Sequence, residues 1–171
     1  MSWTVSPVLR AKTASLFPPY RLYEPTNELT SIEIRYEYWR KSIVFIGDAP
    51  LIGHGTGSIK GLFERAAVNQ TGAVAEITNN PHNQTLSVAI QWGLIGVLAL
   101  YAMWLSHLAL FGNADWISWA GLLIVVQNIA SSLFNSHVFD FMEGWIYVLG
   151  AGVAGGMALR NRRLNPLSSR P

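Results

Sequence analysis

The chain has 171 residues, of which 50% are hydrophobic and 13% charged, with seven Trp and no Cys. Its formal net charge is only +2, and this small excess of positive charge comes largely from four C-terminal arginines, Arg160, Arg162, Arg163 and Arg170. The charge distribution therefore excludes a nucleic-acid partner. The absence of cysteine excludes a disulfide framework and a thiol nucleophile, and is compatible with an oxidising periplasm.

The N-terminal residues predict loop rather than helix. Residues 6–27 are rich in proline and turn formers, including Pro18, Pro19 and Pro25, which predicts an extended stretch. Residues 1–16 contain no apolar core of the length that a signal peptide needs. A segment outside the membrane needs a signal or a preceding span to cross it, so we expect further membrane helices upstream.

The first helix is predicted to begin at Thr30 and to end near Gly47. Thr30 and Glu33 form a capping-box pattern. Apolar residues then recur with the period of an amphipathic helix, at Ile32, Tyr36, Trp39, Ile43 and Ile46. Arg35 lies at the edge of this stripe, one turn before Trp39. We expect it to be partly buried, either paired with a local carboxylate or with its stem along Trp39.

Residues 53–58, Gly-His-Gly-Thr-Gly-Ser, are similar to a phosphate-binding loop but lack the spacing and the terminal Gly-Lys-Ser/Thr of a nucleotide P-loop. The better interpretation is a flexible turn into a short helix at about residues 58–67. The chain has no G-x-S-x-G sequence, so a serine hydrolase has little support. The histidines lack metal-ligand spacing, so no metal site and no cofactor are expected: His54, His82, His107 and His137.

Three apolar stretches predict three membrane-spanning helices, at residues 85–111, 116–134 and 141–159, and no charged residue lies between 144 and 159. Each is close to the roughly 20 residues that a helix needs to cross a ~30 Å hydrocarbon layer. Large polar side chains are rare in the first two stretches, and hydrocarbon tolerates them only when they face neighbouring helices. The lipid bilayer is therefore an expected partner.

The arginines directly after the last stretch predict the orientation of the chain. Positive residues next to a span favour the cytoplasmic side, and three crossings then place residues 1–84 in the periplasm. The predicted divisions are a periplasmic segment at 1–84, three transmembrane helices at 85–159 and a basic cytoplasmic tail at 160–171.

Small residues recur on the last predicted span. Gly152 and Gly156 form a small-xxx-small pair. Ala151 and Gly155, each one residue earlier, form a second such pair. Such faces allow helices to approach closely. They can pack the three helices against each other or dock this chain in a larger bundle, and the sequence leaves both interpretations open.

The tetrapeptide Pro81-His82-Asn83-Gln84 comes directly before the first long uncharged stretch. It places an imidazole where a polar segment meets the membrane. His82 can be a capping or interfacial residue, or a base for chemistry on a lipid-linked substrate. Asn83 can orient the ring, bind sugar hydroxyls or cap the span.

Four motifs in order carry a resemblance to a known family: Arg35-x-x-x-Trp39, residues 48–57 (DAPLIGHGTG), residues 80–86 (NPHNQTL) and residues 92–96 (WGLIG). Together they resemble the C-terminal part of the O-antigen ligase and polymerase family. These are polytopic inner-membrane glycosyltransferases that move a glycan from undecaprenyl diphosphate to an acceptor. The resemblance implies a mainly α fold of about a dozen helices, of which this chain is a large periplasmic loop and the last three helices.

The resemblance also implies roles for individual residues. Arg35 matches an arginine that is expected to bind the donor diphosphate, and His82 matches a histidine that is expected to act on the acceptor hydroxyl. A guanidinium offers a planar, permanently charged fork to phosphate oxygens, and a neutral imidazole can accept the hydroxyl proton. Asn83 is predicted to bind substrate. Other family residues of the diphosphate site would lie upstream.

The predicted function is transfer of O-antigen or a related glycan to lipid A core in lipopolysaccharide biosynthesis. An O-antigen polymerase or a protein O-oligosaccharyltransferase would show the same residues here. A different possibility is a truncated, non-catalytic membrane module that assembles with a partner supplying the other helices. A membrane-tethered binding domain is disfavoured, because residues 1–84 offer too little pattern to bury a core.

Overall fold

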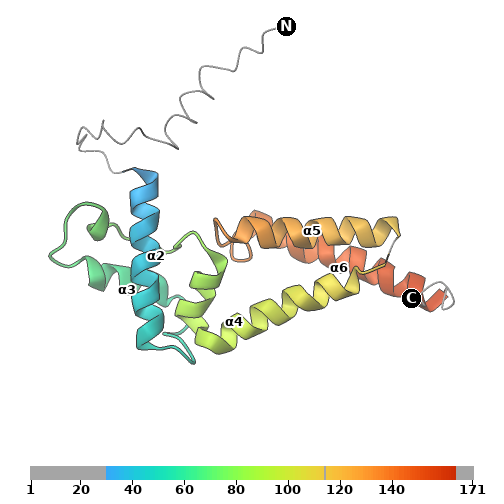
Figure 1. Cartoon of the computed structure of the whole chain (residues 1–171), viewed down its shortest axis with the longest axis horizontal. Helices are drawn as coiled ribbons and strands as arrows, with labels where there is room; N and C mark the ends of the chain where they lie inside the picture. The colour runs from blue at the N-terminus through green and yellow to red at the C-terminus, as the bar shows by residue number, and fades with distance from the viewer. Residues whose placement is uncertain (1–29, 114, 165–171) are drawn as a thin grey trace, which may run out of the picture.

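A computed structural model describes residues 30–113 and 115–164, so the proline-rich stretch at 6–27 and Arg170 lie outside the described residues. The described residues form helices in the following order: α2 (Ser31–Asp48), α3 (Ser58–Ala67), the 3-10 helix η1 (Gly72–Ala75), α4 (Gln84–Leu110), α5 (Trp116–Ser132) and α6 (Phe141–Leu164). The predicted mainly α class is confirmed. α2, α3 and the start of α4 gather at one end of the molecule, and α5 and α6 extend away from it (Figure 1).

Helix α2 begins as the sequence predicts. The Thr30 hydroxyl accepts from the Glu33 backbone N–H, and the Glu33 carboxylate accepts from the Thr30 N–H, which completes the capping box. The buried face of α2 differs from the predicted stripe. Residues of the stripe are largely exposed, among them Ile32, Tyr36 and Ile43. The core instead takes Tyr38, Lys41, Ser42 and Phe45.

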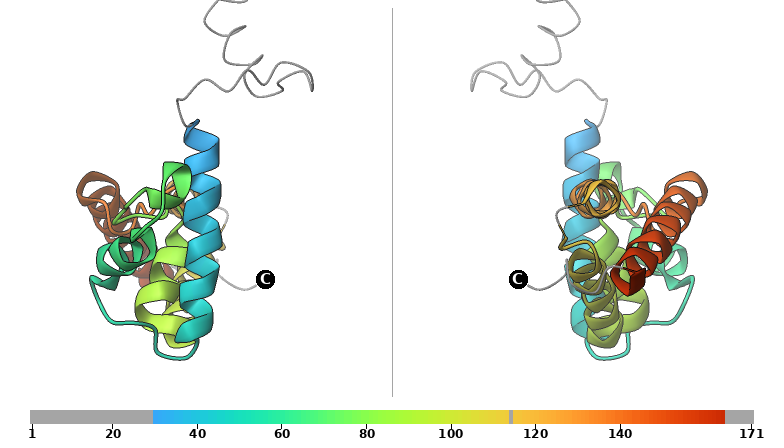
Figure 2. Two further views of the ribbon diagram at one scale, coloured as in Figure 1. Left: turned by 90° about the vertical axis from the view of Figure 1, so that its left-hand side faces the viewer. Right: turned by 90° about the vertical axis from the view of Figure 1, so that its right-hand side faces the viewer.

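The buried face of α2 is selected by aromatic packing. Tyr38 and Phe45 both make edge-on contacts with the ring of Phe63 in α3, at centroid distances of 5.5 and 5.3 Å. Phe63 and Ile90 of α4 are fully buried in the same cluster. Edge-on aromatic pairs of this kind add stabilisation beyond the area that they bury. The cluster joins α2 and α3 to the first turns of α4, and Figure 2 shows these helices lying close together.

Helix α4 is broken at Gly93, whose φ of 59° and ψ of −152° are not helical. A break leaves backbone groups without helical partners, and the segment 49–57 supplies them. Two of its N–H groups donate to α4, and two of its carbonyls accept from α4: His54 N to Ile90 O (2.8 Å), Gly55 N to Gln91 O (2.9 Å), Leu94 N to Pro50 O (2.8 Å) and Ile95 N to Leu51 O (3.3 Å).

Two glycines make this backbone contact possible. A Cβ on Gly53 would lie 2.4 Å from the Gln91 carbonyl carbon, and a Cβ on Gly93 would lie 2.4 Å from the Leu51 carbonyl carbon. Both glycines also have positive φ, where other residues are strained. The glycine-rich segment is therefore a backbone clamp on the α4 break, which goes beyond the flexible turn that was predicted.

Helices occupy all three stretches that were predicted to span the membrane. α4 and α6, with 27 and 24 residues, are long and apolar enough to cross a membrane. α5 is apolar but has 17 residues, a length of about 26 Å. Figure 1 shows α4 bending and then running beside α5 and α6, and the non-helical residue inside α4 is Gly93.

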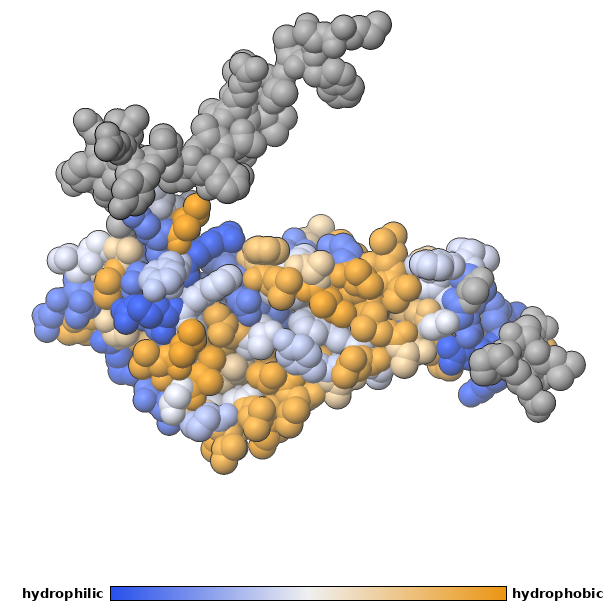
Figure 3. Space-filling model, in the orientation of Figure 1, coloured by the Kyte–Doolittle hydropathy of each residue, from blue (hydrophilic) through white to orange (hydrophobic). Residues whose placement is uncertain are grey.

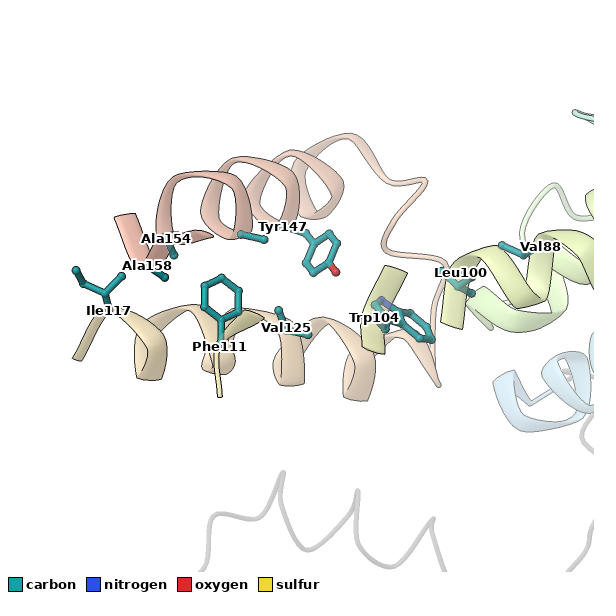
Figure 4. Close-up of a cluster of buried hydrophobic side chains, with 10 residues drawn as sticks. Val88, Leu100, Trp104, Phe111, Ile117, Val125, Tyr147, Ala154 and Ala158 are labelled. Atoms are coloured by element: carbon teal, nitrogen blue, oxygen red, sulfur yellow. The ribbon is translucent and has the colours of Figure 1, made fainter. Parts of the chain in front are cut away.

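The three apolar helices share one buried cluster (Figure 4). The Phe111 ring packs over Gly121, where a Cβ would lie 2.2 Å from the ring. Ala151 is buried and Gly155 meets Leu110, so this small-residue face packs the helices together. The other face is open, because a Cβ on Gly152 or Gly156 would meet no described atom within 4 Å.

The C-terminal arginines lie on the last turns of α6, which continues to Leu164. Arg162 donates from Nη2 to the Leu110 carbonyl at the end of α4 (2.7 Å), a typical cationic cap. Apolar surface covers much of the region of α4, α5 and α6, and hydrophilic surface gathers at the C-terminal end of α6 and around α2 (Figure 3). This all-helical arrangement is compatible with a fragment of a polytopic membrane protein.

Candidate active site

His82 lies between η1 and α4 in a constrained conformation. Its φ of 55° is in the left-handed region, which costs a residue with a side chain on the order of 1–3 kcal/mol. Its backbone N–H donates to Asn80 Oδ1 (2.8 Å). Its half-buried ring stacks on Tyr38 of α2, at 6.3 Å between centroids and 22° between planes. Several contacts therefore hold the imidazole in place.

The connection between α5 and α6 supplies a partner for the ring. Asn135 Oδ1 lies 3.1 Å from His82 Nδ1 and also accepts from Asn80 Nδ2 (2.9 Å). Asn135 Nδ2 donates to Asp140 Oδ2 (3.1 Å), and Ser136 Oγ donates to Asn80 Oδ1 (2.8 Å). Sequence reasoning missed Asn135 and Asp140, because they lie 53 and 58 positions after His82 in no recognisable motif.

Arg35 lies on α2, one turn before two residues that contact the segment of His82. Tyr38 and Trp39 follow it by one turn, about 5 Å along the helix. Tyr38 stacks on His82, and Trp39 Nε1 donates to the Pro81 carbonyl (3.0 Å). The structure therefore brings Arg35 and His82 to one side of α2.

The predicted partial burial of Arg35 is wrong, because its side chain is exposed. The core takes the face of α2 that carries Lys41 and Phe45. Arg35 makes no hydrogen bond or ion pair with another described residue, so the expected local carboxylate is not there either. No described residue therefore occupies its guanidinium.

Asn83 is the N-cap of α4. Its Oδ1 accepts from the Leu86 N–H (3.0 Å), and its Nδ2 donates to the Leu133 carbonyl (3.1 Å). Both ends of the amide are used in this way, and Asn135 rather than Asn83 contacts the His82 ring. Substrate binding by Asn83 stays a prediction.

Two further ionisable groups near the site have structural roles. Burial, with the charge of Glu76 adding to it, raises the pKa of Tyr38, whose ring stacks on the imidazole, above its ordinary value. Burial also lowers the pKa of Lys41. The Lys41 ammonium donates to the Val74 carbonyl and lies 5.5 Å from the centre of the Phe63 ring, so its charge is used within the fold.

Two cavities adjoin the network. A polar cavity of about 430 Å³ is lined partly by network residues, including Asn80, Ser136 and Asp140. An apolar groove of about 580 Å³ runs along α4 beside it. Trp92 and Phe139 line both and contact each other edge-on at 5.6 Å. A polar cavity beside an apolar groove suits an amphiphilic molecule, although His82 itself lines neither.

One group of described residues has the chemistry of metal ligands. The ligand atoms of His137, Asp140 and Glu143 all lie within 4.8 Å of each other. His137 Nδ1 is 3.6 Å from Asp140 Oδ2, which already accepts from Asn135. These side chains can hold a divalent cation in principle, and the absence of a metal site stays a prediction.

A comparison with protein families shows the family of this chain. A family model described as O-antigen ligase matches residues 5–101, more than half of the chain. The chain belongs to the O-antigen ligase family. The resemblance seen in the sequence is thereby confirmed, and the O-antigen ligase match includes Arg35, the backbone clamp and His82. Family membership supports an O-antigen ligase- or polymerase-type function in a membrane setting.

A relative of this O-antigen ligase family member is an uncharacterized protein of Haemophilus influenzae. It is 27% identical over 89 residues, which are 52% of this chain and 22% of the relative. The chain thus spans about a fifth of the length of that protein. Asn135 and Asp140 lie beyond the residues that match the family, so the network joins the matched region to the helices that follow it.

Proposed function

We propose that this chain forms the acceptor-activating part of a glycosyltransferase that moves O-antigen or a related glycan from undecaprenyl diphosphate to a sugar of lipid A core. The observation that carries the proposal is the environment of the two nitrogens of the His82 imidazole. Nδ1 is occupied by Asn135, and Nε2 has no hydrogen-bond partner in the described part of the chain. A ring held at one nitrogen and free at the other has the arrangement of a general base.

In the proposed reaction, His82 Nε2 takes the proton of the acceptor hydroxyl while that oxygen bonds to the anomeric carbon of the donor sugar. The bond from this carbon to the diphosphate oxygen breaks, and its electron pair leaves with the lipid diphosphate. Arg35 binds phosphate oxygens and stabilises the charge that grows there. The imidazolium then releases its proton to water or to the departing diphosphate. The residues described here need no metal for these steps.

The setting supports an amphiphilic substrate. The polar cavity and the apolar groove lie side by side where α4 breaks. We place residues 1–84 in the periplasm and Arg160, Arg162 and Arg163 on the cytoplasmic side of the inner membrane, following the positive-inside tendency. Because the chain spans 22% of its Haemophilus relative, the activity is proposed for a protein that also contains the remaining part.

The test replaces each proposed residue in the protein expressed in its native membrane, in a strain without the native copy. His82→Ala and Arg35→Ala should each reduce glycan transfer by about 10² to 10⁴, measured as glycan-bearing lipopolysaccharide on gels. Arg40→Ala is the matched control, because Arg40 is on the same helix and pairs with Glu37 (2.9 Å). It should transfer normally.

Membrane levels of all variants are compared by immunoblot. Near-normal transfer by His82→Ala or Arg35→Ala would contradict the assignment. The identity of the acceptor is tested separately, with lipid A core, a growing glycan and a protein acceptor supplied in turn to detergent-solubilised enzyme.

A further inference from the structure

The hydrogen bonds around His82 have a direction that follows from the chemistry of the groups. A side-chain amide has one accepting oxygen and one donating nitrogen, and its orientation is read from its partners. Asn80 accepts from the backbone N–H of His82 (2.8 Å), and a backbone N–H can only donate. The oxygen of Asn80 must therefore face His82 N–H, and its NH₂ group must face Asn135 (2.9 Å).

The other end of Asn135 leads to the same orientation. Its second contact is with Asp140 Oδ2 (3.1 Å), and an ionised carboxylate can only accept. The NH₂ group of Asn135 therefore faces Asp140, and its oxygen faces Asn80 and His82. The His82 nitrogen 3.1 Å from that oxygen is Nδ1. It can form a hydrogen bond only if it carries the proton.

We propose that Asn135 is a positioning residue that holds the neutral His82 ring as the Nδ1–H tautomer. A neutral imidazole has one N–H, so a proton on Nδ1 leaves the lone pair on Nε2, the nitrogen without a partner among the described residues. The opposite tautomer would present an N–H to the acceptor hydroxyl and could not take its proton. This inference rests on the proposed role of His82 as base.

The arrangement also explains why the connection between α5 and α6 closes over the start of α4. Asn135 of that connection bonds His82, and Asp140 bonds Asn135. Ser136 adds bonds to Asn80 and to Ser87 of α4 (2.8 and 2.5 Å). The connection between α5 and α6, far from Arg35 in the chain, thus determines which nitrogen of the His82 ring carries the proton.

The kinetic test is Asn135→Leu in the membrane-embedded protein, since leucine is close in size and cannot accept a hydrogen bond. We expect kcat to fall about 10²-fold or more with KM within about threefold, because the loss is in proton transfer and not in binding. Asn128→Leu is the control. Asn128 is also an asparagine whose oxygen accepts from a ring N–H, that of Trp104 (3.3 Å), but it lies outside the network, so kcat per folded protein should stay within about threefold.

The spectroscopic test reads the tautomer directly in the native protein. The native protein is labelled with ¹⁵N-histidine, and the ring signals of residue 82 are assigned by their loss in His82→Gln. At a pH where the ring is neutral, these signals should show a protonated Nδ1 and an unprotonated Nε2. Asn135→Leu should shift the population toward Nε2–H.

The results test the role of Asn135 and the role of His82 separately. A native ring protonated mainly on Nε2, or a kcat for Asn135→Leu within threefold of the native value, overturns the role of Asn135. If His82→Ala transfers glycan normally, it is the base assignment that fails. If His82→Ala is inactive while Asn135→Leu is active, the proposed function stands and only the positioning role falls.

Discussion

Gly93→Ala would test the backbone clamp that holds segment 49–57 on the α4 break. Gly93 has φ of 59° and ψ of −152°, a region essentially restricted to glycine, where another residue costs about 1–3 kcal/mol. The new Cβ would also lie 2.4 Å from the Leu51 carbonyl carbon, so the segment must move away. Four backbone hydrogen bonds would then be lost, at about 1 kcal/mol each.

The sum is about 5–7 kcal/mol, which is comparable with the whole stability of many domains. The matched control is Gly57→Ala. Gly57 also has positive φ, at 78°, but a Cβ there would meet no described atom within 4 Å. This control should cost only the conformational penalty of about 1–2 kcal/mol.

The assay is equilibrium unfolding of the purified protein in detergent, followed by tryptophan fluorescence. Trp92 reports on the clamp directly, because its Nε1 donates to Thr56 Oγ1 (2.9 Å). Limited proteolysis within residues 49–57 gives a second readout, since a released segment becomes accessible. If Gly93→Ala is destabilised no more than Gly57→Ala, the clamp does not carry the stability assigned to it.

Two further predictions concern pH. Hydrogen bonds from Ser118 hold the pKa of Asp115 below its ordinary value of 3.8, so the stability that Asp115 adds at the start of α5 is present above that value and is lost as pH falls through the lowered one. Asp115→Ala should melt at a lower temperature than the native protein at neutral pH and approach it in acid, while Asp115→Ser keeps a capping oxygen and loses less; parallel pH curves would refute this. Burial lowers the pKa of Lys41, so between the lowered value and the ordinary 10.5 the unfolded chain binds more protons and native stability rises with pH. Denaturant unfolding of Lys41→Met should lack that rise, and a variant that retains it would show that another group is responsible.

Local features were predictable from the sequence because their causes lie within a few residues. The capping box sets the start of α2, and its end at Asp48 was predicted to within one residue. The helix at 58–67 and the three apolar helices likewise follow from capping, glycine and charge patterns read along the chain. The motif that contains His82 was also recognisable, since its residues are consecutive.

The tertiary structure decided which surfaces meet. The apolar stripe of α2 was visible in the sequence, but the rings of Tyr38 and Phe45 against Phe63 determined the buried face. Likewise, the contact of segment 49–57 with Gly93 depends on backbone atoms that no side-chain pattern reveals. For the site, the sequence by itself determined that an imidazole stands where the chain enters the apolar helices. Only the fold brought Asn135, 53 positions away, to one of its nitrogens, because hydrogen bonding depends on distance in space and not on separation along the chain.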